Sequence, residues 1–441
     1  MLATIVESVT TILTFAGIFY FIAVLWSGRS FMRTSSPKPT TGLNGAPLEF
    51  APAVSILKPV RGLDPGMHEA FASHCRQVYA GDYEILFGVS SLDDPADAPV
   101  IDAIERLMSE FPERSIRLVE CPEKLGPNGK MGNVVQLARE ARYDYLIVND
   151  SDIRVGPRYL QKVMAEFQRQ GTGRRDQGTE RQGSEQQGTG HRDQGTERQG
   201  SGVTSLRDKP VGLVTVPYRG RAHGTLGSKL EGLGIATDFF PGVLVALKMD
   251  GEIRFGLGST LAVSRTALDA IGGFAPLVDS LADDYELGHR IAQAGFAVAL
   301  SREVVDTSVP AYDFSGYLAH QLRWARGIRD SRKAGYLGLI FTFGLPWAML
   351  NAVASGFSLE SLALLSLTYL ARVTVALAVG VGILGDRQVL RDLWLLPVRD
   401  LAALGVWAWS FAGNTVTWRG QTFTLENGVL KGGGQGSGSR D

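Results

Sequence analysis

The chain has 441 residues, of which 44% are hydrophobic and 20% are charged. Its 44 basic and 45 acidic side chains nearly cancel, so the charge balance gives no reason to expect nucleic acid as a partner. The two cysteines, Cys75 and Cys121, lie far apart without metal-ligand spacing, which argues against a disulfide framework and indicates reduced thiols.

The first predicted element is an N-terminal transmembrane helix, assigned to residues 1–28. Val9–Trp26 is a run of 18 residues without a charge, about the minimum length that spans a bilayer. A cleaved signal peptide is the alternative, but Glu7 rather than a basic residue precedes the apolar run, and no small-residue cleavage site stands out. Arg29 and Arg33 follow the run, so the positive-inside rule places the next segment in the cytoplasm.

Residues 29–52 are rich in Pro, Ser, Thr and Gly and are predicted to tether this helix to one catalytic domain over residues 53–335. Strand and helix patterns alternate in the domain. The predicted strands are 53–60, 83–90, 115–120 and 143–149, and the predicted helices between them are 67–78, 96–111 and 128–141. This alternation predicts an α/β fold with a mostly parallel sheet, whose ligands bind beyond the carboxyl ends of the strands.

An insertion interrupts the domain at residues 170–202. The segment QGTGRRDQGTERQGS at 170–184 returns at 187–201 with one change in fifteen positions. A tandem duplication without apolar residues cannot bury a core, so we predict a disordered surface segment. Strand signals resume at residues 211–217, as expected if the insertion entered a loop of a complete fold.

The C-terminal part, residues 336–413, is predicted to hold transmembrane or re-entrant helices. Its apolar segments are residues 336–356, 361–384 and 393–413. The first two are long enough to span a bilayer. The third contains Pro397, Arg399 and Asp400, which a lipid-facing helix tolerates poorly, so its topology stays open. Residues 414–441 are assigned to a C-terminal tail.

Acidic clusters lie where predicted strands end. Asp150-Ser151-Asp152 follows one strand, and two carboxylates at that place can share an oxygen-ligated Mg²⁺ or Mn²⁺ that also binds a diphosphate. Capping of the next turn is the alternative. Asp93 and Asp94 follow another strand, and they either cap the next helix or contact the base or ribose of a nucleotide.

A third cluster, Asp283-Asp284, precedes a predicted helix, where it complements the positive end of the helix dipole. In an inverting sugar transfer a carboxylate takes the proton of the acceptor hydroxyl, and Asp284 is the candidate for this base. Lys130 and Asn133 open another helix and can reach a phosphate and a base or sugar edge; a capped helix start explains them equally well.

Arg323 and Trp324 close the domain just before the C-terminal apolar segments. An arginine can neutralise a departing diphosphate, and a tryptophan can stack on an acceptor. An interfacial helix with a snorkelling Arg and an anchoring Trp is the alternative, and both can hold together. In this order, the clusters indicate transfer of a sugar from a nucleotide diphosphate to a hydroxyl at a membrane surface.

The motifs SILKPVRGLDP, LDDPA, NDSDIRV, ADDY and LRW, with the turn at residues 128–133, resemble the ceramide glucosyltransferase family. This family of membrane glycosyltransferases has bacterial relatives that include hopanoid-associated lipid glycosyltransferases. The resemblance covers about residues 54–324, and Trp418-Arg419-Gly420 is similar to the family's C-terminal signature. It implies a GT-A fold, a UDP-sugar donor, a divalent metal (Mg²⁺ or Mn²⁺) and inversion at the anomeric carbon.

The motifs together single out the following site residues. The expected catalytic residues are Asp284, Arg323 and Trp324; the expected nucleotide-sugar-binding residues are Asp93, Asp94, Lys130, Asn133, Asp150, Asp283 and His320; the expected metal ligands are Asp150 and Asp152. Two positions depart from the family. His320 stands where the motif usually has Gln or Arg, which leaves open how the diphosphate or acceptor is held. Asp152 stands where the animal ceramide enzymes carry Gly, which strengthens the expectation of a metal.

We therefore expect a membrane-bound inverting glycosyltransferase that transfers a hexose from a UDP-sugar to a lipid hydroxyl, with UDP-glucose and ceramide as the first expectation. Transfer of N-acetylglucosamine to a hopanoid polyol is one alternative. A polysaccharide synthase-translocator is another, although the predicted spans are few for a polymer channel. A silent UDP-sugar-binding scaffold is disfavoured by the full acidic set.

The expected partners are the sugar nucleotide, the lipid acceptor and the bilayer. The expected location is a bacterial inner membrane, with the catalytic domain facing the cytoplasm.

Overall fold

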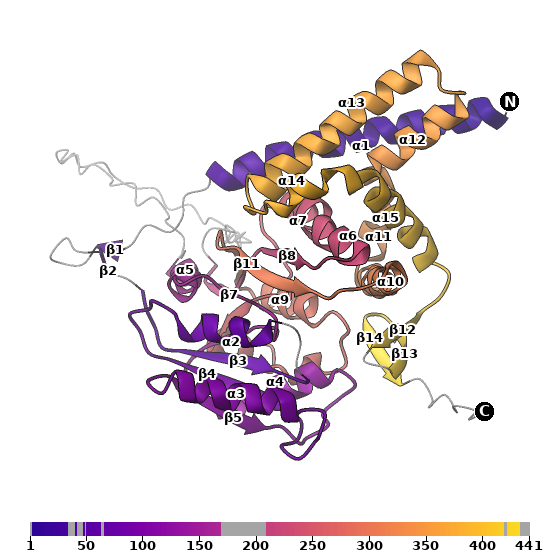
Figure 1. The fold of residues 1–441 in the computed structure, drawn as a ribbon. Coiled ribbons are helices and arrows are strands. Elements are labelled where there is room, and N and C mark those ends of the chain that lie inside the picture. The colour runs from indigo at the N-terminus through magenta and orange to yellow at the C-terminus, as the bar shows by residue number, and fades with distance from the viewer. Residues whose placement is uncertain are drawn as a thin grey trace, which may run out of the picture.

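The computed structural model describes residues 2–33, 40–41, 47–48, 50–62, 66–168, 209–418 and 421–432. The α/β domain predicted over residues 53–335 lies beneath a layer of long helices in the view of Figure 1. The predicted insertion at 170–202 and half of the predicted tether at 29–52 lie outside the described residues, and the insertion stays a prediction. Residues 29–33, which were assigned to the tether, instead continue the N-terminal helix.

A seven-stranded sheet forms the centre of the α/β domain, in the order β10-β7-β9-β6-β3-β4-β5. Its strands are β3 (Val54–Pro59), β4 (Tyr83–Val89), β5 (Ser115–Glu120), β6 (Tyr145–Val148), β7 (Val211–Thr215), β9 (Leu261–Ser264) and β10 (Ala297–Leu300). Neighbouring strands are parallel except β9, which is antiparallel to both β6 and β7. The prediction of a mostly parallel sheet is confirmed.

Helices cover the sheet on both faces, which explains the apolar runs in its central strands, such as Ile56-Leu57 in β3 and Leu146–Val148 in β6. Ile56 and Leu57, neighbours in β3, belong to two different hydrophobic cores. One core includes α2 (Met67–Cys75), α3 (Ala98–Glu110) and α5 (Tyr159–Ala165); the other includes α4 (Gly129–Glu140) and α9 (Asp283–Gln293). Cys75 and Cys121 are both buried and free, as predicted.

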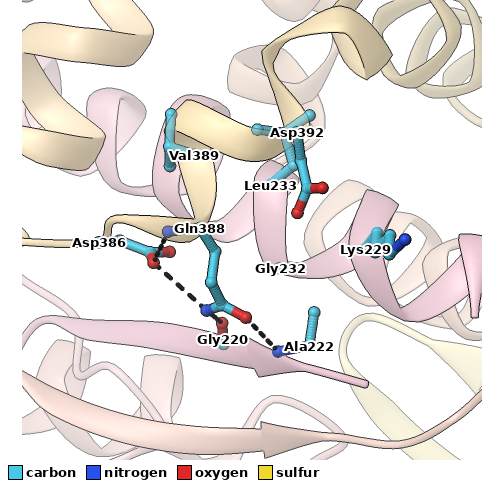
Figure 2. Close-up of a pocket in the computed structure, with 9 residues that line it drawn as sticks. All are labelled: Gly220, Ala222, Lys229, Gly232, Leu233, Asp386, Gln388, Val389 and Asp392. Carbon is cyan, nitrogen blue, oxygen red and sulfur yellow. Dashed lines mark hydrogen bonds between the residues drawn. The ribbon is translucent and has the colours of Figure 1, made fainter. Parts of the chain in front are cut away.

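A two-stranded parallel sheet of β8 (Tyr218–Ala222) and β11 (Val305–Val309) lies beside the main sheet. The side chain of Gln388 occupies the other edge of β8, as Figure 2 shows. Its Nε2 donates to Gly220 O at 2.9 Å, and its Oε1 accepts from Ala222 N at 3.1 Å. These two bonds imitate the pairing of a further strand and attach α14 (Gln388–Asp392) to β8.

Among the described residues, three helical stretches are long and apolar enough to cross a membrane: Thr4–Arg33, Leu226–Asp250 and Leu359–Val381. A bent pair, Lys333–Thr342 and Gly344–Ala354, passes the same test together. The predicted apolar segments at the N-terminus and at 336–356 and 361–384 are thus found as helices. The stretch Leu226–Asp250 was not predicted. It is 67% buried, against 28% for each of the other two, so it packs mainly inside the protein.

The N-terminal helix α1 (Leu2–Arg33) packs along α12 (Gly344–Ala354) and α13 (Leu359–Val375), as seen at the top of Figure 1. Glycines allow the close approach of α1 and α12, because a Cβ on Gly17 would lie 2.2 Å from the Cα of Gly344. The amide of Asn351 adds polar contacts, donating to Thr11 Oγ1 at 2.8 Å and to the carbonyl of Glu7 at 3.0 Å.

Charged residues of the apolar region are paired inside the protein. Arg372 in α13 binds both carboxylate oxygens of Asp400, at 2.7 and 2.9 Å, and Arg399 binds Asp238 at 2.7 Å. Arg372 also donates to the carbonyl of Thr237, within the π-helical segment η3 (Ile235–Phe239), at 2.9 Å. These pairs explain why helix α15 (Leu396–Ser410) can carry charges in an apolar sequence: they face protein partners.

The predicted C-terminal tail contains a folded element. The strands β12 (Thr415–Trp418), β13 (Gln421–Glu426) and β14 (Val429–Gly432) form an antiparallel sheet. Its last turn contacts the loop before α9: the amide of Leu281 donates to Gly428 O at 3.1 Å, and the amide of Leu430 donates to Asp279 O at 2.8 Å. Together with α10 (Phe314–Ser331), this sheet holds the C-terminal region to the catalytic domain.

Candidate active site

The candidate site begins where β6 ends. Asn149 follows β6, is fully buried, and donates through Nδ2 to the carbonyl of Ser259 at 2.8 Å and to Thr260 Oγ1 at 2.9 Å. These bonds fix the turn that carries Asp150 and Asp152 at the carboxyl edge of the sheet. The location agrees with the general position of ligand sites in α/β sheets.

Lys130 connects two of the predicted acidic clusters. Its ammonium lies 2.8 Å from Asp150 Oδ1 and 3.3 Å from Asp283 Oδ2. Burial disfavours the charged form of Lys130, but the carboxylates of Asp150 and Asp283 outweigh burial and hold its pKa above the ordinary value. Asn128 sets this geometry, because it caps α4 by accepting from Met131 N at 3.1 Å and donates to the carbonyl of Ser280 at 2.9 Å.

Asp284 lies against a glycine-rich segment. The amide of Gly256 donates to the Asp284 carbonyl at 3.0 Å, and a Cβ on Gly258 would lie 3.2 Å from Asp284 Oδ2. On the α9 side, a Cβ on Gly288 would lie 2.4 Å from the carbonyl carbon of Phe255. The glycines therefore permit the backbone contact that positions Asp284. Burial, and then the charge of Asp283, raise the pKa of Asp284 to about 6, although Lys130 opposes the change.

One carboxylate oxygen of Asp152 has hydrogen-bond partners within the protein. Its Oδ2 accepts from Thr307 Oγ1 at 2.5 Å and from Ser308 N at 3.0 Å, so it attaches β11 to the turn after β6. Burial, and then the charge of Asp150, raise the pKa of Asp152. Within the described ranges, no three side chains of His, Cys, Asp or Glu come together closely enough to hold a metal ion.

Asp93, Asp94 and Asn133 have local roles in the structure. Asp94 Oδ1 accepts from Ala96 N at 2.9 Å, within the turn that precedes α3. The N-cap residue of α3 is Asp97, so neither Asp93 nor Asp94 caps the helix. Both aspartates lie after β4, two strands from β6 in the sheet. Asn133 is buried and donates to Gly88 O at 3.3 Å, so it holds α4 against β4.

Sequence reasoning did not single out Lys58. This fully buried residue of β3 donates from Nζ to the backbone carbonyl of Asp150 at 3.1 Å. Burial lowers its pKa to about 7, while Asp152 and Asp150 act in the opposite direction. The signal was visible in the sequence, because Lys58 is a charged residue inside the apolar strand SILKPV.

Tyr218, at the start of β8, was also not singled out. Burial raises its pKa above the ordinary range, and the charges of Asp284, Glu231, Asp150 and Asp152 act in the same direction. The charges of these four carboxylates therefore all act on the Tyr218 hydroxyl. No sequence pattern predicts this, because β8 acquires its neighbours only in the folded chain.

His320, Arg323 and Trp324 lie together on α10. The Nδ1 of His320 lies 2.8 Å from Oε2 of Glu231, a buried residue of α6 (Leu226–Gly234). The His320 ring lies between two aromatic rings, with centroid distances of 5.3 Å to Tyr312 and 4.8 Å to Trp324. Glu231 and Tyr312 were not predicted.

Comparison with known proteins identifies relatives. The sequence model of a family described as Glycosyl transferase family 21 matches residues 9–177 and 201–430. The chain is 26% identical over 276 residues to Ceramide glucosyltransferase 3 of Caenorhabditis elegans, a match that covers 62% of this chain and 50% of that protein. It is 31% identical over 106 residues to the Ceramide glucosyltransferase of Komagataella phaffii, covering 23% and 20% of the two chains. The chain thus matches half of these relatives' length or less.

The fold is similar to that of the mannosyltransferase PcManGT from Pyrobaculum calidifontis, solved in complex with GDP-Man and Mn²⁺. The TM-score is 0.54 at 17% sequence identity, over 92% of this chain and 99% of that chain. At this identity the likeness concerns the fold alone. It confirms the prediction of a GT-A-type domain with apolar helices at the N-terminus and in the C-terminal region.

Proposed function

The chain belongs to glycosyl transferase family 21, and on this premise we propose that it is a membrane-bound inverting enzyme that transfers a hexose from a UDP-sugar to a lipid hydroxyl. We favour UDP-glucose and ceramide, because both relatives named above are ceramide glucosyltransferases. The observation that carries the proposal is the group formed by Asp150, Asp283, Asp284 and Lys130 at the carboxyl edge of the sheet.

The proposed reaction uses Asp284 as the base. The acceptor oxygen forms a bond to the anomeric carbon while the bond from that carbon to the diphosphate oxygen breaks, and UDP leaves. The hydroxyl proton passes to the Asp284 carboxylate. A carboxylate with a pKa of about 6 is ionised at neutral pH and is a stronger base than an ordinary aspartate, which supports this role.

We assign the donor to the region of Asp150, where Lys130 lies 2.8 Å from Asp150 Oδ1. In this proposal Lys130 and Arg323 supply positive charge for the diphosphate, Arg323 assists the departure of UDP, and Trp324 stacks on the acceptor. Asp283 holds Lys130 in place, at 3.3 Å. Asp93 or Asp94 contacts the nucleoside, and Asn133 supports the donor site through its bond to β4.

The donor set fits a hard divalent cation. Asp150 and Asp152 offer carboxylate oxygens, which Mg²⁺ and Mn²⁺ prefer, and Asp150 stays 40% exposed. Since the described residues contain no group of three metal-binding side chains, phosphate oxygens of the donor would complete the coordination. A bound cation would neutralise charge on the diphosphate leaving group.

We further propose that the apolar helices anchor the enzyme in a bacterial inner membrane with the catalytic domain on the cytoplasmic side. Arg29 and Arg33 at the end of α1, with Arg326, Arg329 and Arg332 before the C-terminal helices, support this orientation by the positive-inside rule. The lipid acceptor would then reach the site from the bilayer.

UDP release by the purified protein in detergent tests the proposal. A panel of UDP-sugars is combined with ceramide or a hopanoid polyol, with and without Mn²⁺, and Asp284→Asn is the inactive control. We expect release that depends on ceramide and is lost in the variant, with an inverted anomeric configuration in the product. Release only with the hopanoid polyol would change the acceptor. Release without either lipid, accompanied by long products, would favour a polysaccharide synthase, and no release with any donor would overturn the proposal.

A further inference from the structure

We propose that Glu231 and His320, framed by Tyr312 and Trp324, form the binding site for the hydroxyl-bearing head of the lipid acceptor. This inference rests on the proposed function and deepens it by naming the residues that select the acceptor. It concerns a pair outside the acidic group. His320 takes the place of the Gln or Arg that the family motif usually has.

The contact between the two side chains defines what the pair can offer a ligand. A carboxylate can only accept, so the hydrogen of His320 Nδ1 points to Glu231 Oε2 at 2.8 Å. Nε2 is then the ring nitrogen that remains for a ligand, and the described residues provide no hydrogen bond to it. The side chain of Glu231 is 4% exposed and that of His320 is 16% exposed, so the opening lies on the histidine side.

The surrounding rings suit an acceptor with both hydroxyl and carbon surfaces. Tyr312 is stacked on His320 with 29° between the ring planes, and Trp324 is tilted by 53° on it. Aromatic rings cover the C–H surface of a ligand, while the polar edge of the imidazole makes the directed bond. Stacking also holds the imidazole in one orientation, so a ligand does not have to order it on binding.

The helix that carries Glu231 leads into the apolar helices. The α6 segment that carries Glu231 continues through η3 into α7 (Phe240–Asp250), and α7 packs on α1. On the other side, α6 packs on β8, which carries Tyr218. Burial raises the pKa of Tyr218, and the charges of Asp284 and then Glu231 act in the same direction. We therefore place the approach of the lipid head along α6, from the apolar helices towards the pair.

The charges favour the acceptor over the donor as the occupant. A diphosphate is bound by groups with a positive charge, as Lys130 and Arg323 provide. The His320–Glu231 pair has no net positive charge even when the imidazole is protonated, and the buried carboxylate of Glu231 would repel a phosphate. A hydroxyl can both donate to and accept from such a pair, and it brings no negative charge close to the Glu231 carboxylate. We therefore assign His320 to the acceptor, although the sequence had suggested the donor.

The test compares Michaelis constants for the two substrates. We expect His320→Ala to raise the KM for ceramide at least tenfold while the KM for the UDP-sugar changes less than twofold. Glu231→Gln should act in the same direction, and the double variant should be no worse than His320→Ala, because the two residues act as one unit. His320→Gln should recover much of the ceramide affinity, since the glutamine amide can also donate a hydrogen bond to Glu231. His68→Gln, which removes the histidine of a surface pair with Glu110 at 3.3 Å, is the matched control.

Two other outcomes would overturn the inference. A rise in the donor KM with an unchanged ceramide KM would assign the pair to the donor. A fall in kcat and melting temperature without change in either KM would mean that the pair only supports the fold. If the wild-type protein shows no turnover, the proposed function fails, and titration of a fluorescent short-chain ceramide still tests the pair. Equal affinity of the wild type and His320→Ala for this probe would then refute the site.

Discussion

The pH dependence of the reaction offers a sharp test of Asp284 as the base. Burial and Asp283 raise the pKa of this carboxyl to about 6, and a base works only in its ionised form. We therefore expect kcat/KM to rise with pH, to reach half of its plateau near pH 6, and to fall to roughly a tenth of the plateau at pH 5. An ordinary aspartate would keep full activity at that pH.

Two variants should move this profile in opposite directions. Lys130→Met removes the cation that opposes the shift, so the half-maximal pH should rise. Asp283→Asn removes the anion that raises the pKa of Asp284, so the half-maximal pH should fall. Glu286→Gln, on the same helix but paired with Arg290, should leave the profile unchanged. UDP release at saturating metal measures each curve. Shifts in one direction for both variants, or none, would refute the electrostatic reasoning.

Three further predictions concern the fold. Arg372→Met should destabilise the protein by about 3 kcal/mol, because Asp400 loses its bidentate partner, and adding Asp400→Leu should restore much of the melting temperature in detergent. Gly288→Ala should lower both turnover and thermal stability, since its Cβ would clash with the backbone of Phe255, whereas Gly405→Ala, whose Cβ meets nothing within 4 Å, should be tolerated. Deletion of residues 170–201 should change neither activity nor melting temperature; a severe loss would show that the repeat packs on the domain.

The sheet was predictable because its strands are buried on both faces and appear as short apolar runs between helical patterns. The acids at the strand ends were predictable for the same reason, since the ends of the runs mark the edge of the sheet. The pairing of Lys130 with Asp283 was not, because it depends on a contact between α4 and the loop before α9, which lie far apart in the sequence.

Two elements were missed for identifiable reasons. The apolar helix at Leu226–Asp250 is interrupted in the sequence by Lys229, Glu231 and Asp238, which hide its length from a search for uncharged runs. The C-terminal sheet carries a clear signal, because Asn427-Gly428 between alternating apolar residues is typical of a hairpin. The prediction of a C-terminal tail at residues 414–441 overlooked this hairpin signal.

The C-terminal sheet also restricts the number of times that the chain can cross a bilayer. The helices from Lys333 to Ser410 leave the catalytic domain at α10 and return to it at β12, so both ends of this segment are held on one side of any bilayer. A segment with both ends on one side must traverse the bilayer an even number of times. If the bent pair at 333–354 and the stretch Leu359–Val381 cross a bilayer, they supply one outward and one returning passage. Together with a crossing α1 this would make three passages, and the first residues of α1 would lie on the side opposite the α/β domain.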